Sequence, residues 1–96
     1  MYFEWDENKN KINIEKRGIS FEVAKLIFND PNILSIIDDR YSVDERWISL
    51  GNAAGITILY VAHTYEEDQY GEEVIRIISA RKATKSERKR YIQSDF

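Results

Sequence analysis

The stretch RWISLGNAAGITILYVAHTY, residues 46–65, indicates the fold most strongly. Apolar and polar side chains alternate over residues 46–51, and residues 55–65 are rich in β-branched and aromatic residues, as is typical of β-strands. The sequence GNAAG between these two segments suits a hairpin loop. We therefore predict two antiparallel strands in the middle of the chain, the second of them central to a sheet.

Further strands are expected on either side of this hairpin. The sequence ILSIIDD at 33–39 is a short apolar run, and the loop EEDQYGEE after the hairpin leads to a strand at about residues 73–81. The brief alternation of YFEW near the start of the chain suits a short edge strand. These segments predict an antiparallel meander of about four strands and one short N-terminal strand.

Two helices are predicted between the N-terminal strand and the meander. Asp6 is suited to cap a polar helix that Gly18 ends, although its three asparagines weaken it, so that docking must hold it in place. Ser20 is suited to cap a second helix, whose apolar residues recur at helical spacing until the sequence NDP at 29–31 stops it. The second helix therefore has an apolar face to bury.

A C-terminal helix is predicted to follow the last strand. Thr84 and Glu87 have the spacing of a capping box, in which each side chain bonds to the backbone N–H of the other residue. The predicted fold class is α+β, with helices segregated from the meander. The length of the chain predicts a single domain over residues 1–96.

Composition excludes several classes of protein. The chain has no cysteine, which rules out thiol nucleophiles, zinc ribbons and disulfide frameworks. No apolar run approaches the roughly 18 residues of a membrane span, and the acidic, aromatic N-terminus is unlike a signal peptide. We therefore expect a cytoplasmic protein. The acidic loop EEDQYGEE has no metal-ligand spacing, and neither a metal nor a cofactor is expected.

Charge is distributed unevenly along the chain. Residues 76–96 contain seven of the fourteen lysines and arginines but only two of the seventeen acidic residues, a local excess of +5 in a chain of net charge −3. Such asymmetry favours an anionic partner.

Three arginines and the only histidine are the candidate site residues. Arg46 and Arg76 are each expected to share a strand face with apolar residues, whereas Arg81 is expected on the opposite face from Arg76. An arginine on an apolar face is costly unless a partner neutralises it or the face stays open to receive one. If the meander pairs in sequence order, Arg46, His63 and Arg76 should converge at one edge of the sheet.

Such a cluster suits cleavage of RNA without a metal. The 2′-hydroxyl must lose a proton to attack phosphorus, the phosphorane carries extra negative charge, and the leaving 5′-oxygen must gain a proton. Arginine can stabilise the phosphorane, and histidine can carry the proton near neutral pH. Glu45, Tyr41 or Tyr91 could assist, although a regular strand would turn Glu45 away from Arg46.

The same residues also have purely structural interpretations. His63 could be a packed strand residue, and Arg46 and Arg76 could pair with acidic residues, of which Asp44, Glu45, Glu72 and Glu73 are nearest in the sequence. The basic C-terminal helix could be only a solvated face. Two other function classes therefore remain beside catalysis: a module that binds nucleic acid, and a protein-interaction domain that docks an acidic partner.

Five blocks of sequence carry a resemblance to a known family. They are FEWDENK at 3–9, Asn13, KRG at 16–18 leading into SFEVAKLIFNDP at 20–31, YSVDERWISLG at 41–51, and IRIISARKATKSERKRY at 75–91. In this order they resemble the BrnT family, the toxin halves of bacterial type II toxin–antitoxin pairs, whose fold is similar to that of RelE-type ribonucleases. The last block is the most specific.

The resemblance implies a metal-independent ribonuclease that blocks translation. It also implies restraint by an antitoxin, typically of the ribbon-helix-helix DNA-binding class, in a complex that represses its own operon. The recurrent polar positions of the family fall on Arg46, His63, Thr64, Arg76, Arg81, Arg88 and Tyr91. The family commonly has KHG where this chain has KRG at 16–18, so the role of that histidine cannot be inherited.

These observations lead to one assignment of roles. Arg46, Arg76 and Arg81 are predicted to bind phosphate or stabilise the phosphorane, and His63 to carry the proton. The residues predicted to bind RNA are Lys85, Arg88, Lys89 and Tyr91.

Overall fold

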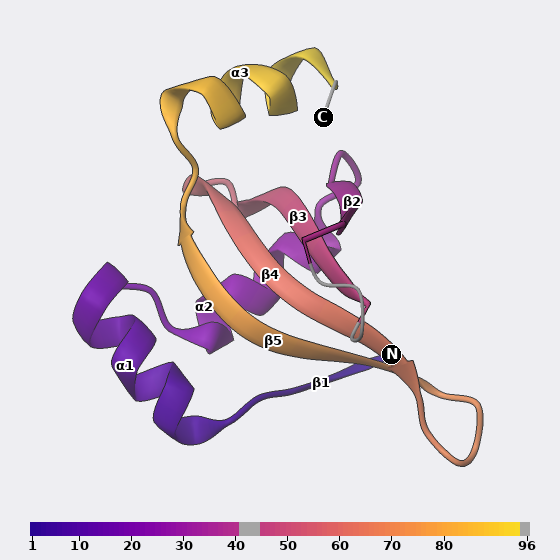
Figure 1. Ribbon diagram of the computed structural model, residues 1–96. Coiled ribbons are helices and arrows are strands. Elements are labelled where there is room, and N and C mark those ends of the chain that lie inside the picture. Colours follow the sequence, from indigo (N-terminus) through magenta and orange to yellow (C-terminus); the bar gives the residue numbers. More distant parts are fainter. Residues whose placement is uncertain (41–44, 95–96) are drawn as a thin grey trace.

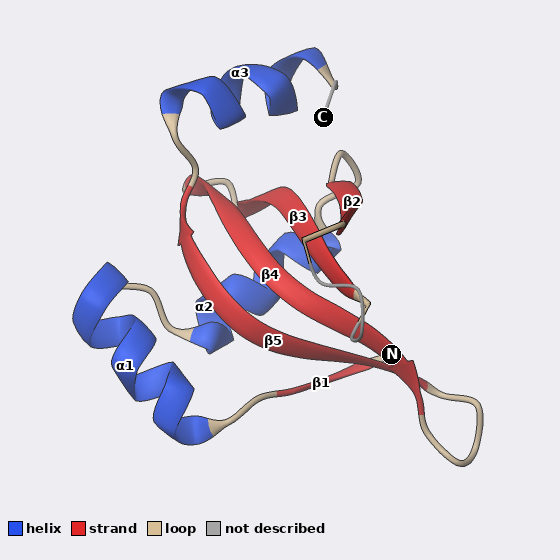
Figure 2. Cartoon of the chain, in the orientation of Figure 1, coloured by secondary structure: helices blue, strands red, loops and turns tan. Residues whose placement is uncertain are grey.

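The computed structural model describes residues 1–40 and 45–94, and it confirms the α+β fold (Figure 2). Its elements are β1 (Tyr2–Glu4), α1 (Glu7–Arg17), α2 (Phe21–Ala24), the 3-10 helix η1 (Lys25–Asn29), β2 (Leu34–Asp38), β3 (Arg46–Ala53), β4 (Thr57–Glu67), β5 (Glu73–Lys82) and α3 (Lys85–Gln93). The predicted order is therefore confirmed, with the second predicted helix divided into α2 and η1. None of the helices among the described residues is long and apolar enough to cross a membrane.

The strands form one sheet in the order β1-β5-β4-β3-β2. The four strands β2 to β5 pair antiparallel in sequence order, as the meander prediction requires. β1 pairs parallel with the first part of β5. In Figure 1, α2 lies behind the sheet, α1 lies beside β5, and α3 stands beyond the end of β5. The sheet therefore has one face covered by α2 and η1. We call the opposite face the open face, although Ile48 and Leu50 on β3 are buried there.

The core lies on the helix-covered face. Phe21 and Ile27, from α2 and η1, are fully buried against the strand residues Leu59, Val61, Ile75 and Ile77. Gly51 on β3 makes this packing possible, because a Cβ atom there would lie 2.7 Å from Cβ of Ile27. Such a separation is too short for two carbon atoms, so the close approach of η1 to β3 depends on glycine.

Buried amides, rather than an apolar stripe, hold α1 against the rest of the chain. The Asn13 side chain donates to the carbonyls of Ile19 (2.7 Å) and Ala80 (2.9 Å), and it accepts from the Ala80 N–H (3.2 Å). Asn10 accepts from the Phe21 N–H at 2.8 Å. Asn13 thus pairs with the edge of β5 beyond the end of β1. The expectation that docking holds this helix is confirmed, and two of its asparagines do the docking.

The pairing of β4 with β5 contains a β-bulge. The partner of Ala62 is Ser79, whereas the partner of His63 is Ile77, so Ile78 opposes no residue. Such an extra residue shifts the alternation by one, so side chains beyond it point to the opposite face from the one that a regular strand would give.

The bulge changes the predicted positions of two arginines. Arg76 opposes Thr64 and Arg81 opposes Tyr60. Thr64 and Tyr60 are four residues apart on β4, so they share a face. The prediction that Arg76 and Arg81 lie on opposite faces is therefore wrong, because it counted a regular alternation through Ile78. Both arginines lie on the open face.

Candidate functional site

The open face carries a hollow of about 400 Å³ where β3 begins and β4 ends. Three of its cations come from three different elements: Lys9 from α1, Arg46 from β3 and Arg76 from β5. The other lining residues are Glu45, Thr64, Tyr65, Glu66 and Ile78. Arg46 and Arg76, which were predicted to converge, therefore line one hollow. We call it the Arg46–Arg76 hollow.

Arg76 has a weak partner in the structure. The β1–β5 register places Glu4 beside it, and the Arg76 Nη1 atom lies 3.4 Å from Glu4 Oε1. Both side chains are about two-fifths exposed, at 40% and 45%. Exposed pairs of this kind contribute little free energy, so a bound phosphate can compete for the guanidinium. Glu4 was not among the acidic partners considered from the sequence; of those, Asp44 lies outside the described residues, as does Tyr41.

Thr64 adds a hydroxyl group to the hollow. Its Oγ1 atom is buried and has no hydrogen-bond partner within residues 1–40 and 45–94. A buried hydroxyl without a partner is unfavourable by about 1–3 kcal/mol. A phosphate oxygen in the hollow would accept a hydrogen bond from it and remove that cost.

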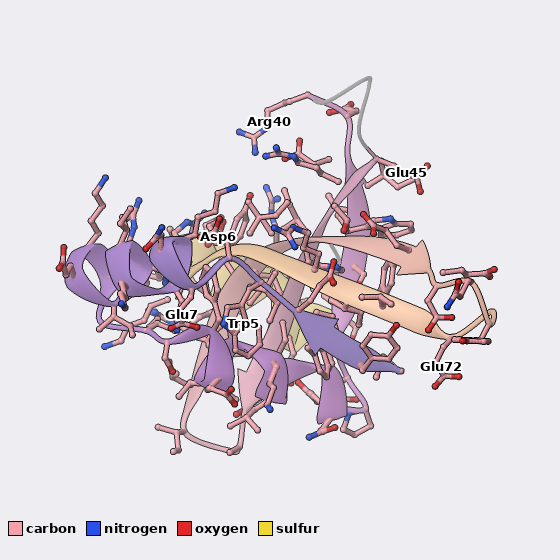
Figure 3. The ribbon with its side chains drawn as sticks, turned by 90° about the horizontal axis from the view of Figure 1, so that it is seen from below. Trp5, Asp6, Glu7, Arg40, Glu45 and Glu72 are labelled. Atoms are coloured by element: carbon pink, nitrogen blue, oxygen red, sulfur yellow. The ribbon has the colours of Figure 1, made fainter. Side chains whose placement is uncertain are left out.

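Glu45 lies in the hollow, contrary to its predicted orientation. Strand alternation predicted that Glu45 and Arg46 point to opposite faces. However, β3 begins at Arg46, and Glu45 lies just before that start (Figure 3), so alternation does not constrain Glu45. Both residues line the hollow. With Glu66 from β4, two carboxylates therefore lie in the same hollow as the arginines.

His63 does not join this group. Its side chain is fully buried on the helix-covered face, edge-on to the rings of Phe28 and Tyr65, each with a centroid distance of 4.9 Å. Its Nε2 atom lies 2.7 Å from Ser49 Oγ, which lies 2.6 Å from Ser35 Oγ. Burial lowers the pKa of His63 from 6.5 to about 4, so the imidazole is neutral at pH 7.

The predicted convergence of His63 with the two arginines is therefore wrong. His63 shares the helix-covered face with the core residue Val61, and its neighbour Thr64 is the residue that faces the hollow. The structural interpretation of His63, a packed and hydrogen-bonded strand residue, describes what is observed.

Arg81 lies toward the other end of β5 and does not line the Arg46–Arg76 hollow. Its guanidinium donates to both carboxylate oxygens of Glu87, at 2.7 and 3.0 Å, and stacks 3.7 Å from the centre of the Tyr60 ring. The hydrogen-bonded pair raises the pKa of Arg81 and lowers that of Glu87. Glu87 also completes the predicted capping box with Thr84. Arg81 therefore ties α3 to the sheet.

The predicted RNA-binding residues of α3 lie apart from the hollow. Lys85, Arg88 and Lys89 line a separate apolar depression on the helix, and no residue of α3 is buried. The Tyr91 hydroxyl donates to the Asp30 carboxylate, which also accepts from the backbone N–H of Asn52. Burial and the Asp30 carboxylate raise the pKa of Tyr91 to about 12. Tyr91 therefore fixes the position of α3 against the rest of the chain.

Lys9 was not anticipated as a site residue. It reaches the hollow because Asn13, four residues later on the same side of α1, is bonded to the backbone of β5. The spacing of Lys9 and Asn13 was visible in the sequence. Nothing in the apolar pattern of α1 showed that this side docks, because the docking groups are amides.

No three His, Cys, Asp or Glu side chains within the described ranges gather in a group that could hold a metal ion. The charged groups of the hollow are its arginines, its lysine and its two carboxylates.

The chain has the α+β fold of a small ribonuclease toxin. A protein-family model described as "Ribonuclease toxin, BrnT, of type II toxin-antitoxin system" matches residues 5–87, and the chain belongs to this family. The crystal structure of the ribonuclease toxin BrnT from Brucella abortus is similar, with 25% sequence identity and a TM-score of 0.66. The match covers 88% of this chain and 99% of the Brucella chain. No curated protein sequence matches significantly.

Proposed function

We propose that the chain is a metal-independent endoribonuclease that cleaves RNA at the Arg46–Arg76 hollow and thereby inhibits translation. The observation that carries the proposal is the meeting of Arg46, Arg76 and the Thr64 hydroxyl, which has no hydrogen-bond partner among the described residues, in one hollow of a BrnT-family chain. These groups bind phosphate by charge and by hydrogen bonding.

The arginines supply the stabilisation that the reaction needs most. Attack of the 2′-oxygen on phosphorus forms one P–O bond and breaks the bond to the 5′-oxygen, leaving a 2′,3′-cyclic phosphate and a 5′-hydroxyl. The phosphorane between these states carries additional negative charge on its oxygens. Arg46 and Arg76 are permanently charged donors fixed on two strands, so they can stabilise this charge without reorganising. The Thr64 hydroxyl donates to a non-bridging oxygen.

Proton transfer falls to the other groups that line the hollow. Glu45 is the proposed acceptor of the 2′-hydroxyl proton, because it lies beside Arg46 at the start of β3. Lys9 is the proposed donor to the leaving 5′-oxygen. His63 has no part in this scheme, since its imidazole is enclosed on the other face of the sheet.

The cations of α3 have a supporting role in this proposal. Lys85, Arg88 and Lys89 contact the RNA backbone outside the hollow, and Arg81 and Tyr91 hold α3 in place for that contact.

A type II toxin has a cognate antitoxin as its partner. We propose that this antitoxin is of the ribbon-helix-helix class, that it restrains the toxin in the cytoplasm, and that the complex contacts DNA only through the antitoxin.

A cleavage assay with modified strands tests the mechanism. The substrates are a random-sequence RNA, the same pool as DNA, and a pool of DNA strands with one central ribonucleotide. Cleavage of the RNA and of the single-ribonucleotide strands is expected, with cyclic phosphate ends and no loss of rate in EDTA. Cleavage of the all-DNA strand, or loss of activity in EDTA, would contradict the mechanism. Binding without product would instead favour the nucleic-acid-binding module.

A further inference from the structure

The Arg46–Arg76 hollow is the first of three adjoining hollows along the seam between α1 and β5. It shares Lys9 and Ile78 with a second hollow. The second hollow shares Lys16 and Arg17 with a third, which extends to Lys82 near the end of β5. Because neighbouring hollows have lining residues in common, they adjoin one another in a row along this seam. We call the residues that line it the α1–β5 track.

The track collects positive charge. Seven of the fourteen lysines and arginines of the chain line it, against two of the seventeen acidic residues, Glu45 and Glu66. The track therefore carries +5 in a chain whose net charge is −3. Local concentration of one sign of charge attracts an extended ligand of the opposite sign.

The cations of α1 are held in place by the buried amide of Asn13. Asn13 is hydrogen-bonded to the backbone of Ala80. Lys9 lies four residues before Asn13 in the sequence, Lys16 three residues after it, and Arg17 four residues after it. These spacings place all three cations on the docked side of the helix. Lys9 and Lys16 are separated by two turns, about 10 Å along the helix axis. The track is therefore a row of cations whose backbone positions on α1 are fixed by this docking.

These cations are available to a ligand. Among the described residues, Lys9, Lys16, Arg17 and Lys82 take part in no ion pair. Arg81, in contrast, is bonded to Glu87 and stacked on Tyr60 within the third hollow.

The middle hollow also offers apolar contact. Ile12, 48% exposed, and Ile78 line it between the cations. Apolar surface beside a row of cations suits a strand whose bases are unstacked and can turn toward the protein, as in single-stranded RNA. A duplex would present only its phosphates to this surface.

We propose that the α1–β5 track binds successive phosphates of single-stranded RNA on one side of the scissile bond. It leads the strand from the Arg46–Arg76 hollow toward the start of α3. The inference rests on the proposed function, because it takes that hollow as the place where the strand is cut. The track extends the site to Lys16, Arg17 and Lys82, for which the sequence indicated no function.

The test measures the salt dependence of binding to a strand that cannot be cut. The probe is a single-stranded oligonucleotide with 2′-O-methyl groups throughout, which blocks attack by the 2′-oxygen. Each phosphate neutralised on a single strand contributes about 0.7 to the slope of log affinity against log salt. Lys16→Ala and Arg17→Ala should each lower the slope by about 0.7, and the double variant by about 1.4.

Lys11→Ala is the matched control. It removes the same charge from the same helix, and Lys11 is exposed and lines none of the three hollows. Its slope should equal that of the original chain. Circular dichroism of each variant shows whether α1 remains folded. If Lys16→Ala and Arg17→Ala leave the slope unchanged, or if Lys11→Ala lowers it equally, the proposal that the track binds RNA is wrong.

Two further outcomes would assign the track to another ligand. Equal affinity for a duplex of the same sequence would overturn the preference for a single strand. Tighter binding of a poly-glutamate peptide, with the same dependence on Lys16, would assign the track to an acidic protein partner. Cleavage of the single-ribonucleotide strands, measured in parallel, tests the proposed function separately. If the strands are cut but the variants do not change the slope, only the proposed role of the track is wrong. If the variants change the slope but no strand is cut, only the proposed nuclease activity is wrong.

Discussion

Two neighbouring residues of β4 show how differently the two faces of the sheet are used. His63 faces the helices, is fully buried and is kept neutral by that burial. Thr64, the next residue, faces the open side and lines a hollow with Arg46 and Arg76. The type of side chain would have suggested the opposite assignment, since histidine is the better proton carrier. The helix cover determines which polar strand residue is structural and which can meet a ligand.

The largest effect on activity is expected for Arg76, on the open face. Arg76→Ala should slow RNA cleavage by about 10²–10³-fold, the usual effect of removing one preorganised group that stabilises the transition state. The free energy of unfolding should hardly change, because the partner Glu4 is half-exposed. Single-turnover cleavage and urea unfolding measure the two effects. Arg90→Ala, an exposed arginine of α3, is the control. Equal loss of activity in both variants would show that Arg76 acts only through overall charge.

His63 should affect stability and its pH dependence, with no direct effect on chemistry. Its pKa is about 4 in the folded protein and 6.5 in the unfolded chain, so the unfolded state binds more protons between these values. The free energy of unfolding should therefore fall as the pH drops from 6.5 to 4, by about 3 kcal/mol in total.

His63→Gln removes this titration but keeps a polar group near Ser49. Urea unfolding of both proteins at several pH values gives the contribution of His63 as a difference, since all other titrating groups are shared. If the two proteins lose stability in parallel over this range, the neutral buried imidazole is refuted.

Asn13 holds α1, and with it Lys9 of the hollow, at the edge of β5. Asn13→Ala should lower the free energy of unfolding by about 2 kcal/mol, because it leaves the N–H and C=O of Ala80 without their partner. Hydrogen exchange at the Ala80 amide should become faster. Asn8→Ala, an exposed asparagine of the same helix, is the control and should change little. Unchanged protection at Ala80 would mean that α1 is not held by this amide.

Thr84 should give the smallest effect. Thr84→Ala removes one half of the capping box that starts α3, which typically costs about 1 kcal/mol of helix stability. Because no residue of α3 is buried, the loss should be confined to that helix and should appear as faster exchange of its amides. Ser86→Ala, within the same helix, is the control. Destabilisation of the sheet as well would show that α3 supports the open face more than its contacts suggest.

Local signals in the sequence predicted the ends of the helices well. Asp6, Ser20 and Thr84 each accept the backbone hydrogen bonds expected of an N-cap, and Gly18 ends α1 with φ of 71°. Each of these signals acts within a few residues, so a short stretch of sequence is enough to predict where a helix begins or ends.

The positions of the site residues were less predictable. The alternation rule placed Arg46 correctly on a face with apolar residues, but it failed for Arg81, because the bulge at Ile78 is not visible as a pattern. It also could not show which face the helices cover, so the predicted convergence of His63 with Arg46 and Arg76 was wrong. Lys9 entered the hollow only because Asn13 docks α1.

The sequence by itself therefore determined the order of helices and strands, the caps, the uneven charge and the resemblance to the BrnT family. The tertiary structure decided which face of the sheet remains open and which cations gather there. The physical reason is the distance along the chain over which the interactions act. Caps and alternation arise from forces between residues close together in the chain, whereas the hollow and the track depend on contacts such as that of Asn13 with Ala80, 67 residues apart.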